Sequence, residues 1–161
     1  MDLSLSTMII GSGATAVTDL WAILRKHILG VVLPDFGLLG RWLAHMPRAK
    51  FRHDSIAAAP RVRGERAIGW IAHYLVGISF AAILVGIWGV EWLDQPSLGP
   101  ALVVGIVTVA APYFVMQPAM GAGIAASRTP RPAAARLHSF VTHAIFGLGL
   151  YAAGWLLDAM G

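Results

Sequence analysis

The sequence predicts an all-α membrane protein with four transmembrane helices and, in the first loop, a further helix at the cytoplasmic membrane surface. Three observations lead to this fold class. Of the 161 residues, 57% are hydrophobic and only 12% are charged. That charged fraction is about half the usual value for a soluble globular protein, so the bilayer must act as part of the solvent. The apolar residues also form four long runs, and the basic residues lie only between runs.

The four apolar runs cover residues 4–24, 67–90, 98–125 and 137–157. A helix needs roughly 20 residues to cross the hydrocarbon core, and a helix satisfies its own backbone groups in lipid. We therefore expect a single membrane domain over residues 1–161. Pro112 and Pro118 are expected to kink the third run or to end it early, near Gln117.

The charges predict the orientation of the chain. All twelve Lys and Arg residues lie in the loop 25–66 and in the loop that follows the third run. The other side carries Asp2, Glu91, Asp94 and Asp158 and no basic residue. By the positive-inside bias, both basic loops are cytoplasmic and both termini are periplasmic, in a bacterial inner membrane. The formal net charge of +4 then reflects orientation and attraction to anionic lipids, and nucleic acid is not expected as a partner.

The cytoplasmic loop 25–66 is too long to be a simple turn. Pro34 and Pro47 bracket a segment from Asp35 to Met46 that is typical of an amphipathic interfacial helix. A second short helix is expected at 56–59, and the basic residues of the loop are expected to anchor the chain to lipid. His27, His45 and His53, which lie in loop sequence, are interpreted as solvated, and His138, at the start of the fourth run, is interpreted as interfacial.

Three ionisable residues stand out deep inside the apolar runs, where their cost makes them candidates for function. Asp19, His73 and His143 each lie six or seven residues from a basic boundary residue. At 1.5 Å per residue they share one depth, about 9–10 Å inward from the cytoplasmic boundary. Gln117 is expected to reach the same layer. We therefore expect Asp19, His73, Gln117 and His143 to line a polar pocket near the cytoplasmic face.

Several chemistries fit this set of side chains. A carboxylate beside an imidazole can relay a proton or an ion. His73, His143 and Asp19 also match the ligand types of a divalent metal site, and the two histidines are placed as axial ligands of haem b would be. A small anionic or quinone-like ligand is a further candidate. The competing interpretation is structural: each histidine hydrogen-bonds a neighbour and nothing else. Met116 and Met120 are interpreted as packing residues.

The second and fourth runs share a weak pattern. One reads Arg66-x6-His73-x3-Gly77 and the other Arg136-x6-His143-x3-Gly147. Both segments enter from the cytoplasmic side, so the match has the same direction and depth. It suggests two parallel hairpins related by an axis along the membrane normal, although so few matched positions also arise by chance.

Four segments together resemble a family of small bacterial inner-membrane proteins that is known only as a domain of unknown function. These segments are Asp35-Phe36-Gly37-x2-Gly40-Arg41-Trp42, His53-Asp54-Ser55-Ile56, Gly69-Trp70-x2-His73-Tyr74 and Gln117-Pro118-x-Met120-Gly121-x-Gly123-x-Ala125-Ala126-Ser127-Arg128-Thr129-Pro130. The resemblance covers nearly the whole chain. It implies a four-helix membrane protein, and it implies no activity, substrate or cofactor.

The function predicted first is binding or transport of a small solute or ion through the polar pocket. The second hypothesis is a membrane redox or enzymatic protein that holds haem or a metal through His73 and His143. The third is an accessory subunit of a larger membrane complex, and a homo-oligomer is compatible with each. A retinal protein is disfavoured because neither Lys26 nor Lys50 lies in a run. The sequence contains no nucleotide-binding glycine motif after a strand, and whether the protein is an enzyme is left open.

Overall fold

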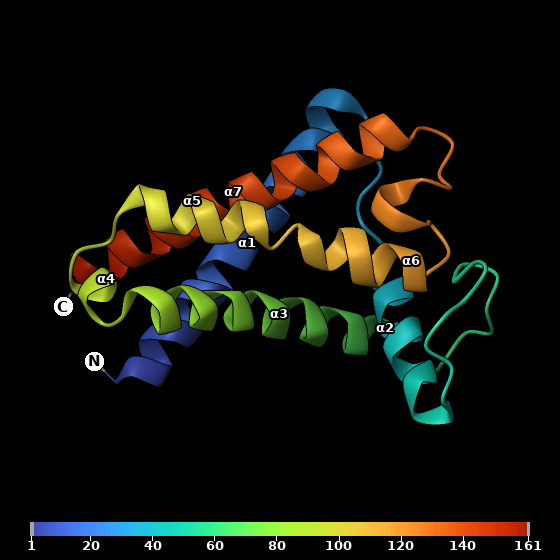
Figure 1. Ribbon diagram of the computed structural model, residues 1–161, viewed down its shortest axis with the longest axis horizontal. Coiled ribbons are helices and arrows are strands. Elements are labelled where there is room, and N and C mark those ends of the chain that lie inside the picture. Colours follow the sequence, from blue (N-terminus) through green and yellow to red (C-terminus); the bar gives the residue numbers. More distant parts are fainter. Residues whose placement is uncertain (1, 161) are drawn as a thin grey trace. The chain divides into compact units, whose positions relative to one another are not determined.

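The computed structural model describes residues 2–160, in which every regular element is helical. Figure 1 shows these elements coloured along the chain. In order they are α1 (Leu3–Leu29), α2 (Phe36–His45), the 3₁₀ turn η1 (Met46–Arg48), α3 (Glu65–Trp88), α4 (Glu91–Asp94), α5 (Leu98–Val107), the π-helical turn η2 (Pro112–Met116), α6 (Gln117–Ala119), the 3₁₀ turn η3 (Ile124–Ala126) and α7 (Pro132–Asp158).

Four helical segments are long and apolar enough to cross a membrane. They are Leu3–Leu29, Glu65–Trp88, Leu98–Ala119 and Pro132–Asp158. The predicted fold class, all-α with four spanning helices, is therefore confirmed. Within residues 2–160 the chain divides into two compact units. The first unit contains residues 2–33, 74–108 and 141–160, and the second contains residues 34–73 and 109–140.

The first helix continues beyond the predicted end at residue 24. Arg25 is buried, with its guanidinium 5.9 Å from the centroid of the Trp21 ring one turn earlier. This pair extends the helical surface past the apolar run. α1 ends where Gly30 adopts a left-handed φ of 65° and its N–H donates to Lys26 O at 3.1 Å, a common way to close a helix.

The third span departs from regular α-helix where the prolines predict it. α5 ends at Val107, and the chain resumes as the π-helical turn η2, which starts at Pro112. Proline lacks the N–H that an α-helix needs at that position. The helical segment stops at Ala119, close to the predicted end near Gln117 and short of residue 125. Four of the next residues have positive φ: Gly121, Gly123, Ala125 and Ala126. The α-helix therefore cannot continue through this stretch.

Small residues bring the helices of the first unit together. A Cβ placed on Gly11 of α1 would lie 2.5 Å from Ile78 Cα of α3. A Cβ on Gly149 of α7 would lie 2.9 Å from Ala14 Cα of α1. One on Gly105 of α5 would lie 2.5 Å from Gly147 Cα of α7. Such close backbone approach is how spanning helices associate without a hydrophobic driving force. The core between them is built around Ile10, Ala14, Ala81, Leu84, Trp92, Ala101, Val104, Phe146 and Leu150.

The second unit packs α2 against the first turns of α3. A Cβ on Gly40 would lie 2.6 Å from Gly69 N, and one on Gly69 would clash with the Phe36 carbonyl group. The predicted amphipathic helix from Asp35 to Met46 is thus present as α2. Asp35 caps it by accepting a hydrogen bond from Gly37 N at 2.9 Å. A small core holds the unit together, with Trp42, Ile56 and Ala119 at its centre.

The segment after η1 is extended and pairs with the end of α6. His53 N donates to Ala119 O at 2.8 Å, and Ile56 N donates to Met120 O at 3.1 Å. The predicted helix at 56–59 is wrong, because this stretch is a turn closed by Ala59 N donating to Ile56 O at 3.2 Å. Pro60 follows directly and disfavours a helical residue before it.

Candidate functional site

The four residues predicted to line one pocket divide between the two units. Asp19 and His143 belong to the first unit, and His73 and Gln117 belong to the second. That all four share one pocket stays a prediction.

Asp19 lies on α1 and is paired with a residue of α3. The Tyr74 hydroxyl donates to Asp19 Oδ2 at 3.1 Å. Both side chains are half-buried. A phenol–carboxylate hydrogen bond satisfies part of the carboxylate in a helix that is long and apolar enough to cross a membrane. The sequence reasoning did not select Tyr74, although a tyrosine inside an apolar run normally needs a polar partner.

His143 lies on α7 and is held from α5. Its Nδ1 is 3.1 Å from Thr108 Oγ1. The Thr108 hydroxyl donates its single hydrogen to Gly105 O at 2.8 Å, so its oxygen accepts from His143 Nδ1–H. In the neutral ring this tautomer leaves a lone pair on Nε2. The ring lies beside Phe80, with centroids 6.3 Å apart. His143 is therefore an oriented imidazole whose Nε2 can accept a proton or bind a metal.

The two remaining residues have neighbours in the second unit. His73 stacks on Phe36 of α2, with ring centroids 4.1 Å apart and planes 26° apart, and Trp70 meets it edge-on at 5.9 Å. Gln117 Nε2 donates to Ser139 Oγ at 3.3 Å. Gln117 Oε1 is buried, and no hydrogen-bond partner for it is found among residues 2–160. The two histidines of the repeated pattern thus have different surroundings, an aromatic stack for His73 and a hydroxyl for His143.

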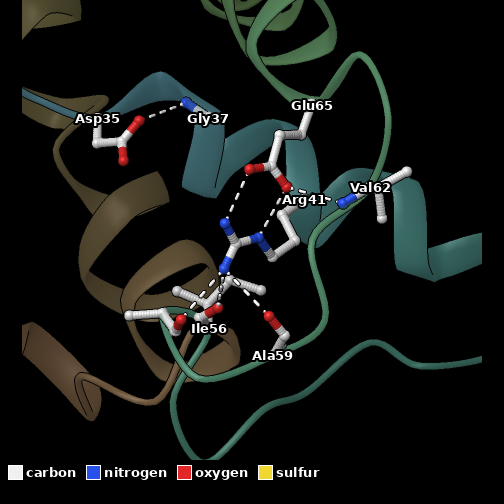
Figure 2. Close-up of polar contacts among 8 residues, drawn as sticks. Asp35, Gly37, Arg41, Ile56, Ala59, Val62 and Glu65 are labelled. Carbon is white, nitrogen blue, oxygen red and sulfur yellow. Dashed lines mark hydrogen bonds and ion pairs between the residues drawn. The ribbon is translucent and has the colours of Figure 1, made fainter.

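The loop expected to lie on lipid contains a buried ion pair. Arg41 Nε and a terminal nitrogen each donate to one oxygen of Glu65 at 2.8 Å. The other terminal nitrogen reaches the carbonyl oxygens of Ile56, Ala57 and Ala59 at 3.1, 3.2 and 3.1 Å. Figure 2 shows these contacts converging on one guanidinium. The hydrogen bonds that Arg41 donates to the Glu65 carboxylate raise the pKa of Arg41 above its ordinary value. The expectation of lipid anchoring is therefore wrong for Arg41, which joins α2, the 56–59 turn and the start of α3.

The prediction that His45 and His53 are solvated is also wrong. Their exposed fractions are only 5% and 7%. His45 Nδ1 lies 2.9 Å from His53 Nε2, so the two rings share one hydrogen. Burial is the main cause that lowers the pKa of His53, and the nearby charges of Lys50 and His45 act in the same direction. The Ala119 backbone carbonyl and the nearby Asp54 act on the imidazole in the opposite direction without reversing this shift.

Among residues 2–160 there is no group of three or more His, Cys, Asp or Glu side chains that could hold a metal ion. The haem and divalent-metal hypotheses for His73, His143 and Asp19 gain no further support from this arrangement and stay predictions.

The chain belongs to the family described as protein of unknown function (DUF2938), whose family model matches residues 8–157. This match confirms the resemblance seen in the sequence motifs. No curated protein and no solved structure matches the chain. The family supplies no chemistry, so any function must be argued from the side chains themselves.

Proposed function

We propose that this protein is a multi-pass membrane protein that binds and moves a small ion, and that the proton is the ion its side chains fit best. The observation that carries the proposal is a shared arrangement in the first unit. Asp19 and His143 are both ionisable, both lie in spanning helices, and each is hydrogen-bonded by a hydroxyl from a neighbouring helix. Ionisable groups in such segments are costly and typically mark ion pathways.

The chemistry of the two pairs supports proton transfer. The Tyr74 hydroxyl on Asp19 can pass a hydrogen in either direction along a hydrogen-bonded chain. His143 presents a lone pair at Nε2 because Nδ1 is committed as a donor. Imidazole is the side chain whose ordinary pKa lies nearest to neutral pH. A proton relay through a helix bundle needs a proton donor and a proton acceptor, and Asp19 and His143 are residues of these two kinds.

The charges outside the spans support a fixed orientation for this activity. Ten of the twelve Lys and Arg residues are exposed, and only Arg25 and Arg41 are buried. Exposed basic side chains beside spanning helices favour the cytoplasmic side and attract anionic lipid headgroups. We therefore propose that both basic loops face the cytoplasm of a bacterial inner membrane and that both termini are periplasmic.

A proton-flux assay tests the function. The purified protein is reconstituted into liposomes that contain a pH-sensitive dye, and a potassium gradient with valinomycin drives proton entry. We expect faster acidification than in protein-free liposomes. Asp19→Asn and His143→Gln should each reduce the protein-dependent rate by about tenfold or more, because each removes a group that transfers the proton.

Two matched variants control for the loss of a charge or an imidazole elsewhere. Asp158→Asn and His138→Gln change exposed residues of α7, and both should keep the wild-type rate. A wild-type rate equal to that of empty liposomes would refute the proposal. Equal slowing by the control variants would show that the effect is not specific to Asp19 and His143.

A second candidate function rests on the same Nε2 lone pair of His143. An oriented imidazole can ligate haem or a metal, as the pattern of His73 and His143 also suggests. An absorption spectrum of the detergent-purified protein tests this directly. A Soret band that is lost in His143→Ala would favour the haem function over proton transfer.

A further inference from the structure

The buried histidine pair of the second unit lies apart from the residues that carry the proposed function. His45 is the last residue of α2, and His53 follows η1 eight residues later. Their exposed fractions of 5% and 7% place both among the most buried polar residues of the chain. The burial of two imidazoles, at the end of α2 and in the segment that follows it, requires an explanation, because a polar group without adequate hydrogen-bond partners is costly to bury.

The fold anchors the backbone on both sides of the histidine pair. The loop between them is closed by Trp42 Nε1, which donates to Phe51 O at 2.8 Å. The His53 backbone is tied to α6 through its N–H bond to Ala119 O at 2.8 Å. A metal site needs ligands that are held before the ion arrives, and these contacts provide such support.

The two nitrogens point directly at each other. His45 Nδ1 and His53 Nε2 are 2.9 Å apart, while the ring centroids are 5.1 Å apart. When two ring nitrogens are 2.9 Å apart, the ring centroids can be only slightly farther apart than the observed 5.1 Å. The two rings therefore meet edge to edge. Two imidazole nitrogens on one metal ion, at about 2.0–2.1 Å each, lie roughly 3.3–3.6 Å from each other. A small separation of the rings would let an ion replace the shared hydrogen.

Thioether side chains pack on the small core of the second unit, to which His53 is tied. The chain has six methionines, and three of them, Met46, Met116 and Met120, pack on the small core of Trp42, Ile56 and Ala119. This is the core to which His53 is tied through Ala119. Met46 also follows His45 directly. Half of the protein's methionines therefore belong to the core that anchors the His53 end of the histidine pair.

This donor set distinguishes between metals. Thioether ligands select monovalent copper, and imidazole accepts copper or zinc, whereas hard divalent ions need carboxylate oxygens. Within residues 2–160 no third His, Cys, Asp or Glu side chain joins the two histidines in a group that could hold a metal. A singly charged ion also loses less solvation energy on burial than a doubly charged one.

We propose that His45 and His53 form a binding site for one cuprous ion, ligated by His45 Nδ1 and His53 Nε2 and completed by a methionine thioether from the same core. The ion enters as Cu(I) and stays Cu(I), so no electron transfer is required. On binding, the hydrogen shared by the two nitrogens moves to the outer nitrogen of its own ring, and both imidazoles stay neutral.

The test is an anaerobic competition between the full-length protein in detergent and a chromogenic Cu(I) chelator. We expect the wild-type protein to withdraw one Cu(I) per chain from the chelator. His45→Asn and His53→Gln should each weaken Cu(I) binding by about tenfold or more, since each removes one imidazole ligand. The amide groups of Asn and Gln can keep the hydrogen bond between the two positions, which protects the fold. His27→Gln, at an exposed histidine of α1, should bind like the wild type.

A second measurement covers the case in which a histidine variant does not fold. X-ray absorption of the Cu(I)-loaded wild-type protein should show two nitrogen scatterers and one sulfur scatterer. A spectrum without sulfur would overturn the thioether assignment, and tighter binding of Zn²⁺ than of Cu(I) would overturn the choice of metal. Retention of full Cu(I) affinity by folded His45→Asn and His53→Gln would overturn the site itself. None of these outcomes depends on proton flux through Asp19 and His143.

Discussion

Arg41 on α2 and Glu65 at the start of α3 are joined at two points, because Nε and one terminal nitrogen of the guanidinium each lie 2.8 Å from a separate carboxylate oxygen. The residues are 24 positions apart in the sequence. The same guanidinium also binds three carbonyl oxygens of the 56–59 turn. One side chain thus fixes three segments of the second unit, a geometry that arginine provides and lysine does not.

Replacing this arginine should destabilise the protein. Arg41→Lys keeps the charge but loses the two-point contact and most of the carbonyl contacts, which leaves buried acceptors without partners. We expect the melting temperature in detergent to fall by about 5 °C or more. Arg48→Lys, at an exposed position, is the control and should melt like the wild type. Equal melting of both variants would contradict this role for Arg41.

Acid should destabilise the metal-free protein through His53. Burial lowers the pKa of His53 from its ordinary value of 6.5, so the folded protein takes up this proton less readily than the unfolded chain. Stability is therefore fully present above about pH 6.5 and is lost as the pH falls below that value. Melting in the presence of a metal chelator, measured from about pH 7.5 down to pH 5, should show this decline.

The groups that face His53 are its hydrogen-bond partner His45, the nearby charges Lys50 and Asp54, and the Ala119 carbonyl. His53→Gln removes the titrating group, so its melting temperature should decline less steeply with acid than that of the wild type. His27→Gln should keep the wild-type pH dependence. If the melting temperature of His53→Gln fell with acid as steeply as that of the wild type, the loss of stability would come from another titrating group.

Close contact between α5 and α7 should make Gly105 intolerant of a side chain. A Cβ there would lie 2.5 Å from Gly147 Cα and 2.7 Å from His143 O, both backbone atoms that cannot move aside alone. Gly105→Ala should therefore lower the melting temperature. Gly86→Ala is a matched control within α3, because nothing lies within 4 Å of a Cβ at that position. It should be neutral or stabilising by up to about 1 kcal/mol, since alanine favours helix over glycine.

The Thr108 hydroxyl should matter for proton movement through its bond to His143. Thr108→Val keeps the shape of the side chain but removes the acceptor that orients the imidazole. We expect slower proton flux in liposomes, with Thr108→Ser close to the wild type. Equal rates in the Val and Ser variants would mean that the orientation of His143 is irrelevant to flux.

The sequence predicted the features that depend on local composition. Run length and charge placement were enough for four spanning helices, and the proline at position 112 predicted the break in the third span. The predicted end of the first helix, at residue 24, is too early. A basic residue after an apolar run usually marks the start of a loop, but Arg25 lies over the Trp21 ring and belongs to α1. Local sequence patterns predict helices, but they do not predict which charged side chains make tertiary contacts.

The candidate residues illustrate the same limit. Asp19 and His143 were identifiable because an ionisable group in an apolar run is conspicuous. Their partners Tyr74 and Thr108 are separated from them by 55 and 35 residues, and no sequence spacing reveals such pairs. The prediction that His45 and His53 are solvated rests on the many basic residues of their loop. Their burial results from the pairing of the 53–56 segment with α6, which is a tertiary contact.

The most direct test of the proposed ion movement is proton flux in the double variant Asp19→Asn/His143→Gln, compared with the double control Asp158→Asn/His138→Gln. Each double variant replaces one aspartate and one histidine. In the first variant these residues are hydrogen-bonded by Tyr74 and Thr108, and in the control they are exposed. We predict that the first variant reduces flux to the level of protein-free liposomes while the second keeps the wild-type rate. Wild-type flux in Asp19→Asn/His143→Gln would contradict the proposal that these two residues carry the proton.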